Sequence, residues 1–569
     1  MNSPVPAADP PPPDAKAARP RRFAAFAQKW LPAAVLVVAL AALASTFIVP
    51  APTGPFDLAG FGRLPVLADG RLKPLDTVAR STLLQIQNRQ DITLDDAQGL
   101  PPIKERLLPP DEWLLDVFYR PEKAASYRTF VIDNPDLLTL IGQTDQSVAI
   151  HYPDLGRQVL ATFDFMPSRR RRFSYRELAP YLAEIADQAK LAQPVDAQGR
   201  TPFQRAVIQL EGSIVLYQDL EHAMQVPGAK DFLGELMRFQ AALPQGIAAV
   251  RAQEAGKPHS EADVHTMLRL GERYSALAGA THLLAIPPPP GDSNLGDWRS
   301  VGQAIMGAFH SGEVDPAALA YAGMGDFWRN NQPGKFNKMV ELYQRALQSE
   351  LGGRIRKIDA EVRFNLAQPF YSAMLLYLVG FFAAILSWLV WPEALRRSAL
   401  TLLALAWAIT TAGILTRMWL GGRPPVTNLY SSALFIGWGS VGLCLILEAA
   451  YKNAMGIVAG GLIGFGTLVI AHHLSLSGDT LEMMRAVLDS NFWLSTHVVV
   501  VTTGYASTFL AGFLALIYIV LGVFTPWLKR DFSRGAGRAS RTETNADALT
   551  RMVYGIVCFA TLFSFVGTV

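Results

Sequence analysis

Cysteine is scarce in this 569-residue chain. Its two cysteines, Cys444 and Cys558, each lie inside an apolar run and form no Cys-x-x-Cys pair. A thiol-redox centre or a zinc site needs cysteines clustered at short spacing, so neither is expected. The chain also lacks the sequence Cys-x-x-Cys-His, which excludes covalent attachment of haem to the chain itself.

Charge is scarce as well, because only 17% of the residues are charged whereas 50% are hydrophobic. The net charge of +3 is small, and the basic residues are scattered or lie beside apolar runs, so we expect no nucleic-acid partner. Charged residues are interspersed through residues 50–366, whereas residues 369–569 form apolar runs separated by short basic loops. The sequence therefore predicts one soluble domain and one bundle embedded in the lipid bilayer.

Long apolar runs are abundant, and each is long enough to cross the ~30 Å hydrocarbon core of a bilayer. They cover residues 31–48, 369–391, 398–417, 430–450, 454–474, 496–525 and 551–569. We expect an all-α polytopic membrane protein with about seven transmembrane helices and a large, mostly helical domain between the first and second spans. The predicted parts are a disordered basic cytoplasmic N-terminus (1–30), a transmembrane anchor (31–49), an extracytoplasmic helical domain (50–366) and a transmembrane bundle (367–569).

Basic residues indicate the orientation of the spans. If residues 1–30 are cytoplasmic, the loops that carry Arg396, Arg397 and Lys452 lie inside, which satisfies the positive-inside rule. The loops near residues 418–429 and 475–495 then face outside. We interpret the first span as an uncleaved anchor because its leader is long for a signal peptide; cleavage after Ala-Leu-Ala at 42–44 is the alternative.

The domain between the first two spans shows mostly helical periodicity, for example in residues 175–189, 203–226 and 228–243. Near its start, Asp69-Gly70 between apolar residues predicts a hairpin turn, followed by a helix that begins near Thr77. The prolines at 287–290 are a stiff break that we interpret as a boundary between two lobes. Its histidines are dispersed and show no metal-ligand spacing, so we expect structural or exposed roles for them.

The outer loop at 417–429 is the first segment with functional character. Its glycine and proline pairs force irregular backbone, and Thr427 or Asn428 can cap the helix that follows. Arg417, Arg423 and Trp419 suit a flat apolar ligand with carboxylate arms, because arginine pairs with carboxylates and aromatic faces stack on rings. Anchoring at the membrane interface is the alternative for these residue types.

The second such segment opens the span at 496–525, where His497 stands at the outer end of an apolar helix. Gly504 and Tyr505 follow seven and eight residues later, which predicts that they share the helix face of His497. A neutral imidazole ligates haem iron well, although a lone histidine is also commonly a hydrogen-bonded structural residue. His472 and His473 end the preceding span on the same predicted side.

Both segments resemble the CcsA-type cytochrome c assembly proteins, the system II haem-handling family. The family pattern Gly-x-x-Pro-x-(Ser/Thr)-Asn-Leu-Tyr is similar to residues 422–432, which include Asn428 and Tyr430. The family segment Trp-x-x-x-His-Val before a Gly/Ala-Tyr pair is similar to Trp493, His497 and residues 504–505. Residues 65–80 are similar to the soluble domain of larger, fused members.

This resemblance implies a role in cytochrome c biogenesis in the bacterial inner (cytoplasmic) membrane, with the large domain on the periplasmic side. Family members present haem b, with its iron reduced, to the Cys-x-x-Cys-His motif of apocytochrome c, whose thiols react with the haem vinyl groups. No residue of the assembly protein is needed as a nucleophile, so we assign no catalytic side chain. The resemblance makes His497 an axial ligand of the haem iron, and the further haem-binding residues that it implies are Trp419, Arg423, Asn428, Tyr430, Trp493 and Tyr505.

The chain departs from the family in lacking its Trp-Gly-x-x-Trp-x-Trp-Asp loop, since none of the eleven tryptophans forms that motif. We interpret the chain as a truncated or split family member. Either a further haem-handling polypeptide or C-terminal segment supplies the loop, which makes the chain a component of a cytochrome c synthetase, or the chain as given cannot do the chemistry. One alternative is a membrane haem transporter, which would need buried charges or broken helices at mid-membrane. The other is a membrane-anchored scaffold subunit whose outer domain binds a partner.

Overall fold

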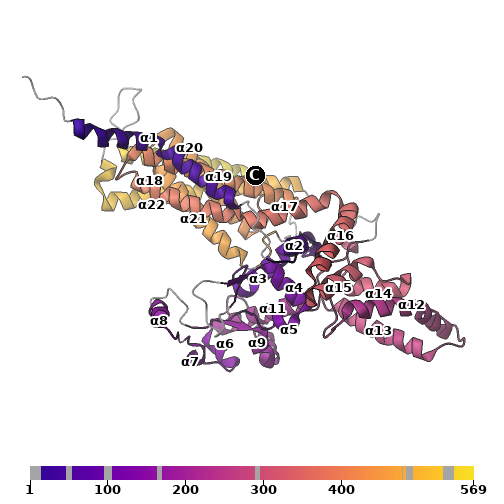
Figure 1. Ribbon diagram of the computed structural model, residues 1–569. Helices are drawn as coiled ribbons and strands as arrows, with labels where there is room; N and C mark the ends of the chain where they lie inside the picture. Colours follow the sequence, from indigo (N-terminus) through magenta and orange to yellow (C-terminus); the bar gives the residue numbers. More distant parts are fainter. Residues whose placement is uncertain are drawn as a thin grey trace, which may run out of the picture. The chain divides into compact units, whose positions relative to one another are not determined.

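The computed structural model describes residues 15–46, 54–94, 106–150, 152–162, 169–288, 295–476, 478–481, 491–529 and 544–568. The chain divides into two compact units (Figure 1). The globular unit comprises Pro50–Asn365 and Ser475–Met483, and the membrane unit comprises Met1–Val49, Leu366–Leu474 and Met484–Val569. Seven helices among the described residues are long and apolar enough to span a membrane, so the predicted all-α polytopic fold is confirmed.

Long helices make up the membrane unit, as expected where hydrocarbon offers no hydrogen-bond partner to the backbone. They are α1 (Ala15–Thr46), α18 (Pro369–Leu386), α19 (Pro392–Gly421), α20 (Leu429–Tyr451), α21 (Met455–Ser475), α22 (Asn491–Phe524) and α23 (Asn545–Thr568), with the short η3 (Pro526–Lys529) between the last two. α19 packs against α1, α18 and α20, and α22 packs against α20 and α23. Where α19 and α20 meet, the fully buried Glu448 pairs with Arg396 at 2.9 Å.

Two boundaries in this unit differ from the sequence prediction. α18 ends at Leu386 rather than at 391. Residues 387–390 form a turn, and Trp391 takes a left-handed conformation (φ 47°) directly before Pro392, where α19 begins. α1 begins at Ala15, so residues 15–30 are helical rather than disordered. Alanine, lysine, arginine and glutamine dominate this stretch and are strong helix formers. Residues 1–14 lie outside the described residues.

The globular unit is mostly helical, with three two-stranded antiparallel pairs among the described residues. Its first half contains α2 (Leu58–Gly62), β1 (Pro65–Ala68), β2 (Arg71–Pro74), α3 (Leu75–Gln87), β3 (Ile92–Leu94), β4 (Arg106–Leu108), α4 (Pro110–Tyr119), α5 (Pro121–Ala124), β5 (Arg128–Val131), α6 (Pro135–Leu140), α7 (Asp145–Val148), α8 (Leu155–Thr162) and β6 (Arg172–Ser174). Its second half contains α9 (Tyr175–Leu178), η1 (Ala179–Tyr181), α10 (Leu182–Ala192), α11 (Pro202–Glu221), α12 (Phe232–Glu254), α13 (Glu261–Gly279), η2 (Leu295–Asp297), α14 (Val301–Ser311), α15 (Pro316–Arg329), α16 (Pro333–Leu351) and α17 (Gly353–Ala367).

One hydrophobic core joins the elements of the globular unit. It runs from Phe61 to Leu347 and includes residues on both sides of the proline stretch at 287–290, for example Ile286 and Val301. The interpretation of this stretch as a boundary between two lobes is therefore wrong. Ile286 also forms a β-bridge with Arg299, so the segments that flank the prolines pair with each other.

The predicted hairpin is confirmed. β1 and β2 pair in the register Pro65↔Pro74 to Ala68↔Arg71, and the two turn residues Asp69 and Gly70 both have positive φ, 52° and 76°. Two consecutive positive φ values are typical of a type I′ turn, which favours Asp-Gly. α3 begins directly after Pro74, so the hairpin leads without a loop into the helix that carries Asp76 and Thr77.

Glycines set the distance between α22 and α23. A Cβ added to Gly504 would lie 2.6 Å from Ser564 Oγ and 3.0 Å from Ser564 N, and one added to Gly567 would lie 3.1 Å from Val501 N. Transmembrane helices approach closely where their contact residues are small. The contact therefore depends on the absence of side chains at these two positions.

Gly504→Leu should destabilise the membrane unit by about 1–3 kcal/mol, because a side chain at a closely packed position forces the helices apart. Gly512→Leu is the matched control, since a Cβ at Gly512 on the same helix meets no atom within 4 Å. Thermal unfolding of the two variants in detergent measures the effect. Equal melting temperatures would contradict the close α22–α23 contact.

Candidate functional site

The predicted ligand loop between α19 and α20 has a defined backbone. Gly422 ends α19 in the left-handed conformation (φ 62°), and its N–H donates to the carbonyl oxygen of Met418. Asn428 caps α20, because its side-chain oxygen accepts from the N–H of Ser431 while the Ser431 hydroxyl accepts from the N–H of Asn428. The sequence prediction of a cap at Thr427 or Asn428 is thus confirmed for Asn428.

Tyr430 lies in the first turn of α20 between two side chains of other helices. The Arg417 guanidinium stands 4.6 Å from the centroid of its ring, and Phe370 meets the ring edge to face at 6.5 Å between centroids. Arg417 is buried, whereas Trp419 is half exposed and Arg423 is partly buried. The loop thus joins α18, α19 and α20 at one end of the bundle and leaves an indole accessible there.

Trp493 and His497 lie four residues apart on α22 and therefore on the same face of the helix. Both side chains are exposed, Trp493 by 65%. One turn further along this face, Val501 meets Gly567 of α23. His497 therefore stands one helical turn beyond the α22–α23 contact, with its imidazole accessible.

Gly504 and Tyr505 do not share one environment, contrary to the sequence prediction that both lie on the face of His497. Gly504 is buried against Ser564, whereas Tyr505 is 62% exposed. The difference follows from the 100° rotation per residue of an α-helix, which puts position 504 close to the azimuth of 497 and moves position 505 away from it. The predicted haem-binding role of Tyr505 therefore loses its geometric argument, while that of His497 keeps it.

His472 and His473 lie in the last turn of α21 with exposed side chains. Within the described parts of the chain, no three or more histidine, cysteine, aspartate or glutamate side chains gather as ligands for a metal ion. The imidazoles of His472, His473 and His497 are all exposed, so the assignment of an iron ligand among them stays a prediction.

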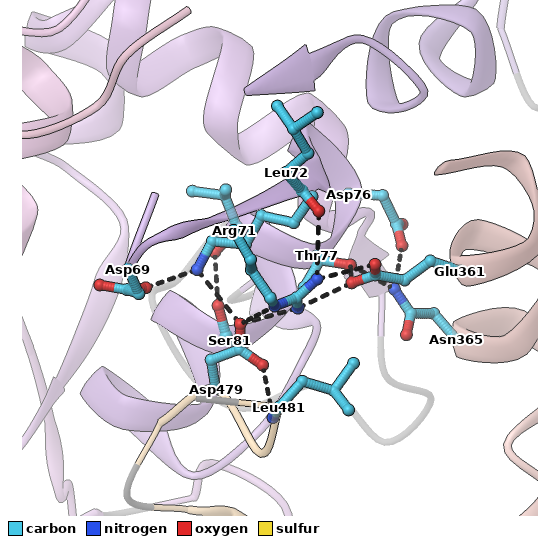
Figure 2. Close-up of polar contacts among 12 residues, drawn as sticks. Asp69, Arg71, Leu72, Asp76, Thr77, Ser81, Glu361, Asn365, Asp479 and Leu481 are labelled. Atoms are coloured by element: carbon cyan, nitrogen blue, oxygen red, sulfur yellow. Dashed lines mark hydrogen bonds and ion pairs between the residues drawn. The ribbon is translucent and has the colours of Figure 1, made fainter. Parts of the chain in front are cut away.

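A second constellation lies in the globular unit, where the hairpin, α17 and the α21–α22 connection meet (Figure 2). Arg71 on β2 donates two hydrogen bonds to Glu361, at 2.8 and 2.9 Å, and two to Asp479, at 2.7 and 3.0 Å. Lys73 Nζ lies 3.2 Å from Asp479 and 2.5 Å from Asp69. Two cations and two carboxylates are thereby buried together.

Neighbouring polar groups complete this ion network. The Thr77 hydroxyl donates to Glu361 at 2.8 Å, and the Asn365 amide donates to Thr77 Oγ1 at 2.8 Å and to Asp76 at 2.9 Å (Figure 2). The N–H of Leu481 donates to Asp479 at 3.0 Å. Buried charges are costly unless they are paired and hydrogen-bonded, and here each carboxylate has several donors.

The ionisation of Asp479 follows from these contacts. Burial raises the pKa of a carboxyl group, but the charges of Arg71 and Lys73 and the N–H of Leu481 outweigh burial and lower the pKa of Asp479 to about 2. For Arg71, burial alone lowers the pKa, whereas Glu361 and Asp479 raise it above its ordinary value. Asp479 and Arg71 are therefore both charged at neutral pH.

Comparison with known proteins places these features in context. No family model matches the chain. The chain is 28% identical to the protein NrfI of Wolinella succinogenes over 198 residues, which is 33% of this chain and 21% of NrfI. It is 25% identical to the cytochrome c biogenesis protein CcsA of Synechococcus sp. strain CC9902 over 183 residues, and 31% identical to CcsA of Cycas taitungensis over 121 residues.

The chain is related to the CcsA-type cytochrome c biogenesis proteins. The resemblance that its two outer segments carry is thus confirmed. The matches cover 58% of the Synechococcus CcsA, 36% of the Cycas CcsA and 21% of NrfI, so the chain spans less than two thirds of each of these CcsA-type relatives.

Sequence reasoning found the hairpin but missed the ion network around it. Arg71 and Lys73 were visible as alternating cations on one strand, and this alternation puts them on the same face. Nothing local marks Glu361 or Asp479 as their partners, because these lie 290 and 408 residues away from Arg71 along the chain.

Stability should depend on the charge of Asp479 in a defined pH window. Since its pKa of about 2 in the folded protein lies below the ordinary 3.8, the carboxylate stabilises the fold above about pH 4 by roughly 2 kcal/mol. This contribution is lost as the pH falls through the interval from about 4 to 2. Asp479→Asn should therefore lower the melting temperature of the detergent-solubilised protein at pH 7, and the difference from wild type should shrink toward pH 3. A difference that stays constant over this range would contradict the assignment of the charge.

Proposed function

We propose that the chain is a haem-handling component of cytochrome c biogenesis. The relatives named CcsA support a role in that process, and seven candidate spans make the chain a multi-pass membrane protein. The observation that carries the finer assignment is the exposed pair Trp493 and His497 on the opening turns of α22. In this proposal the membrane is a bacterial inner membrane, and the globular unit lies on its periplasmic side, as the positive-inside rule favours.

His497 is the residue that holds the iron of the haem substrate in this proposal. A neutral imidazole is a good axial ligand for haem iron, and the side chain of His497 is exposed in the structure. The exposed indole of Trp493 on the same face offers a stacking surface. Further haem contacts in this proposal come from the α19–α20 loop residues Trp419, Arg423, Asn428 and Tyr430. The guanidinium of Arg423 would pair with a haem propionate.

In this proposal, thioether formation needs no catalytic side chain from the chain itself. Each apocytochrome thiol adds its sulfur and hydrogen across one vinyl group, so a thioether forms without loss of any atom. The contribution of the protein is to orient the ring and the peptide and to exclude competing partners. An orienting histidine and aromatic faces fit this task better than an acid–base pair does.

Two partners follow from the proposal. The first is apocytochrome c with its Cys-x-x-Cys-His motif. The second is a polypeptide or further segment that carries the tryptophan-rich loop of the family, which is absent from the sequence. The chain then acts as one component of a cytochrome c synthetase.

A transporter is the competing assignment, since it would use charges buried within the bundle. Among the described spans, Glu448 and Arg396 form such a buried pair. The pair lies close to the end of α20, which terminates at Tyr451, so it fits a structural contact between helix ends better than a transport site at mid-membrane.

His497→Ala should abolish or greatly weaken haem binding, because the iron loses its proposed ligand. The measurement is the absorption spectrum, oxidised and reduced, of protein purified in detergent from haem-replete cells. His265→Ala is the matched control, since His265 is an exposed histidine on α13 of the globular unit. We expect a Soret band and sharp reduced bands in wild type and in the control, and their loss in His497→Ala. An unchanged spectrum in His497→Ala would refute the ligand assignment.

A further inference from the structure

A surface groove lies within the globular unit, between α6, α10 and the start of α11. It has a volume of about 560 Å³ and is lined by Asp136, Thr139, Leu140, Glu184, Gln188 and Phe203. The three lining residues of α6 lie three and four positions apart, and the two of α10 lie four apart, so each set shares one face of its helix. The volume falls in the range of roughly 300–1,000 Å³ that is usual for ligand sites.

The lining combines half-buried apolar side chains with exposed polar ones. Leu140 and Phe203 are half-buried and pack against the hydrophobic core of the unit. Asp136, Thr139 and Glu184 are exposed to solvent. A small-molecule pocket buries most of its ligand, whereas here the charged groups stand in water. The groove therefore suits one side of an extended polypeptide, whose apolar side chain would cover Leu140 and Phe203.

The charge of the groove indicates what kind of polypeptide fits. Among the described residues, the carboxylates of Asp136 and Glu184 form no ion pair, and no basic residue lines the groove. Other carboxylates of this unit do have cationic partners, for example Glu177, which lies 3.1 Å from Arg170. The chain as a whole carries a net charge of +3, so the negative groove is a local feature. Its charge complements a segment that contains lysine or arginine.

The proposed function supplies one polypeptide in a suitable state. Before haem is attached, an apocytochrome lacks the group around which its core packs, so extended segments of its chain are accessible. The Cys-x-x-Cys-His motif has to meet the haem, which leaves the segments outside the motif for a contact elsewhere.

We propose that the groove between α6 and α10 docks a basic segment of apocytochrome c that lies outside the Cys-x-x-Cys-His motif. Cationic side chains of the segment pair with Asp136 and Glu184, and an apolar side chain contacts Leu140 and Phe203. The amide of Gln188, which has no hydrogen bond among the described residues, pairs with the backbone of the segment. This inference rests on the proposed function, and it gives the globular unit a task in substrate recognition.

The test is the binding of fluorescently labelled apocytochrome c to the full-length protein in detergent, measured by fluorescence anisotropy. Both motif cysteines of the probe are replaced by serine, so no step depends on haem or on thioether formation. The double variant Asp136→Asn, Glu184→Gln should raise Kd roughly fivefold, because two exposed charge pairs are lost, each worth a factor of about two to three. Added salt should weaken wild-type binding more than binding by the variant.

The double variant Glu254→Gln, Glu272→Gln is the matched control, since it removes two exposed carboxylates from α12 and α13 of the same unit. We expect wild-type affinity in this control. Gln188→Glu adds a carboxylate to the groove and should lower Kd roughly threefold, a gain that a damaged fold cannot produce.

The inference is overturned if wild type does not bind the probe, if the groove and control variants bind it equally well, or if Gln188→Glu does not strengthen binding. The haem spectra of wild type and His497→Ala test the proposed function separately. If wild type binds no haem while the groove variants change probe binding as expected, the proposed function fails and the docking of a basic polypeptide stands.

Discussion

The hydrocarbon core of a bilayer offers no partner to a backbone amide, and this constraint determines most of what the membrane unit is. Each span must satisfy the hydrogen bonds of its own backbone, so each is a helix. Backbone groups without a partner in the helix are confined to the helix ends, where polar interactions are concentrated. The cap by Asn428, the left-handed Gly422 and the exposed imidazole of His497 all lie at such ends. The residues most capable of chemistry thus stand where a helix meets water.

The same constraint explains which features could be predicted from the sequence. An apolar run long enough to cross the bilayer as a helix predicts a transmembrane span, and Asp-Gly between apolar residues predicts a β-hairpin. Helix boundaries were harder to predict, because α18 ends at Leu386 although the apolar run continues past that residue. The length of α1 depends on helix propensity outside the apolar run.

The candidate site could be predicted only in part, for a different physical reason. His497 and Trp493 are neighbours on one helix, so their common face follows from the sequence alone. Tyr505 was placed on that face by the same argument and does not lie there, because one residue beyond Gly504 rotates it away from α23. The contacts of Arg71 with Glu361 and Asp479 join segments that no local pattern connects.

Burying the ion network costs free energy, because its charged groups lose their hydration. The attraction among the four buried charges offsets this cost with little net gain in folding stability, since well-packed apolar residues in their place often give a protein of equal stability. Paired charges add directionality, since Arg71 donates its hydrogen bonds to the two carboxylates in the plane of its guanidinium. A network of this kind between hairpin, helix and connection specifies where the connection lies in the globular unit.

The central claim is that this chain acts in the covalent attachment of haem to cytochrome c. The most direct measurement is the amount of c-type haem in membranes of the native host, by pyridine haemochrome spectroscopy, with the gene for the chain intact, deleted and restored. The account predicts that c-type haem falls to background on deletion and returns on restoration, while b-type haem is unchanged. Unaltered c-type haem in the deletion strain would contradict it.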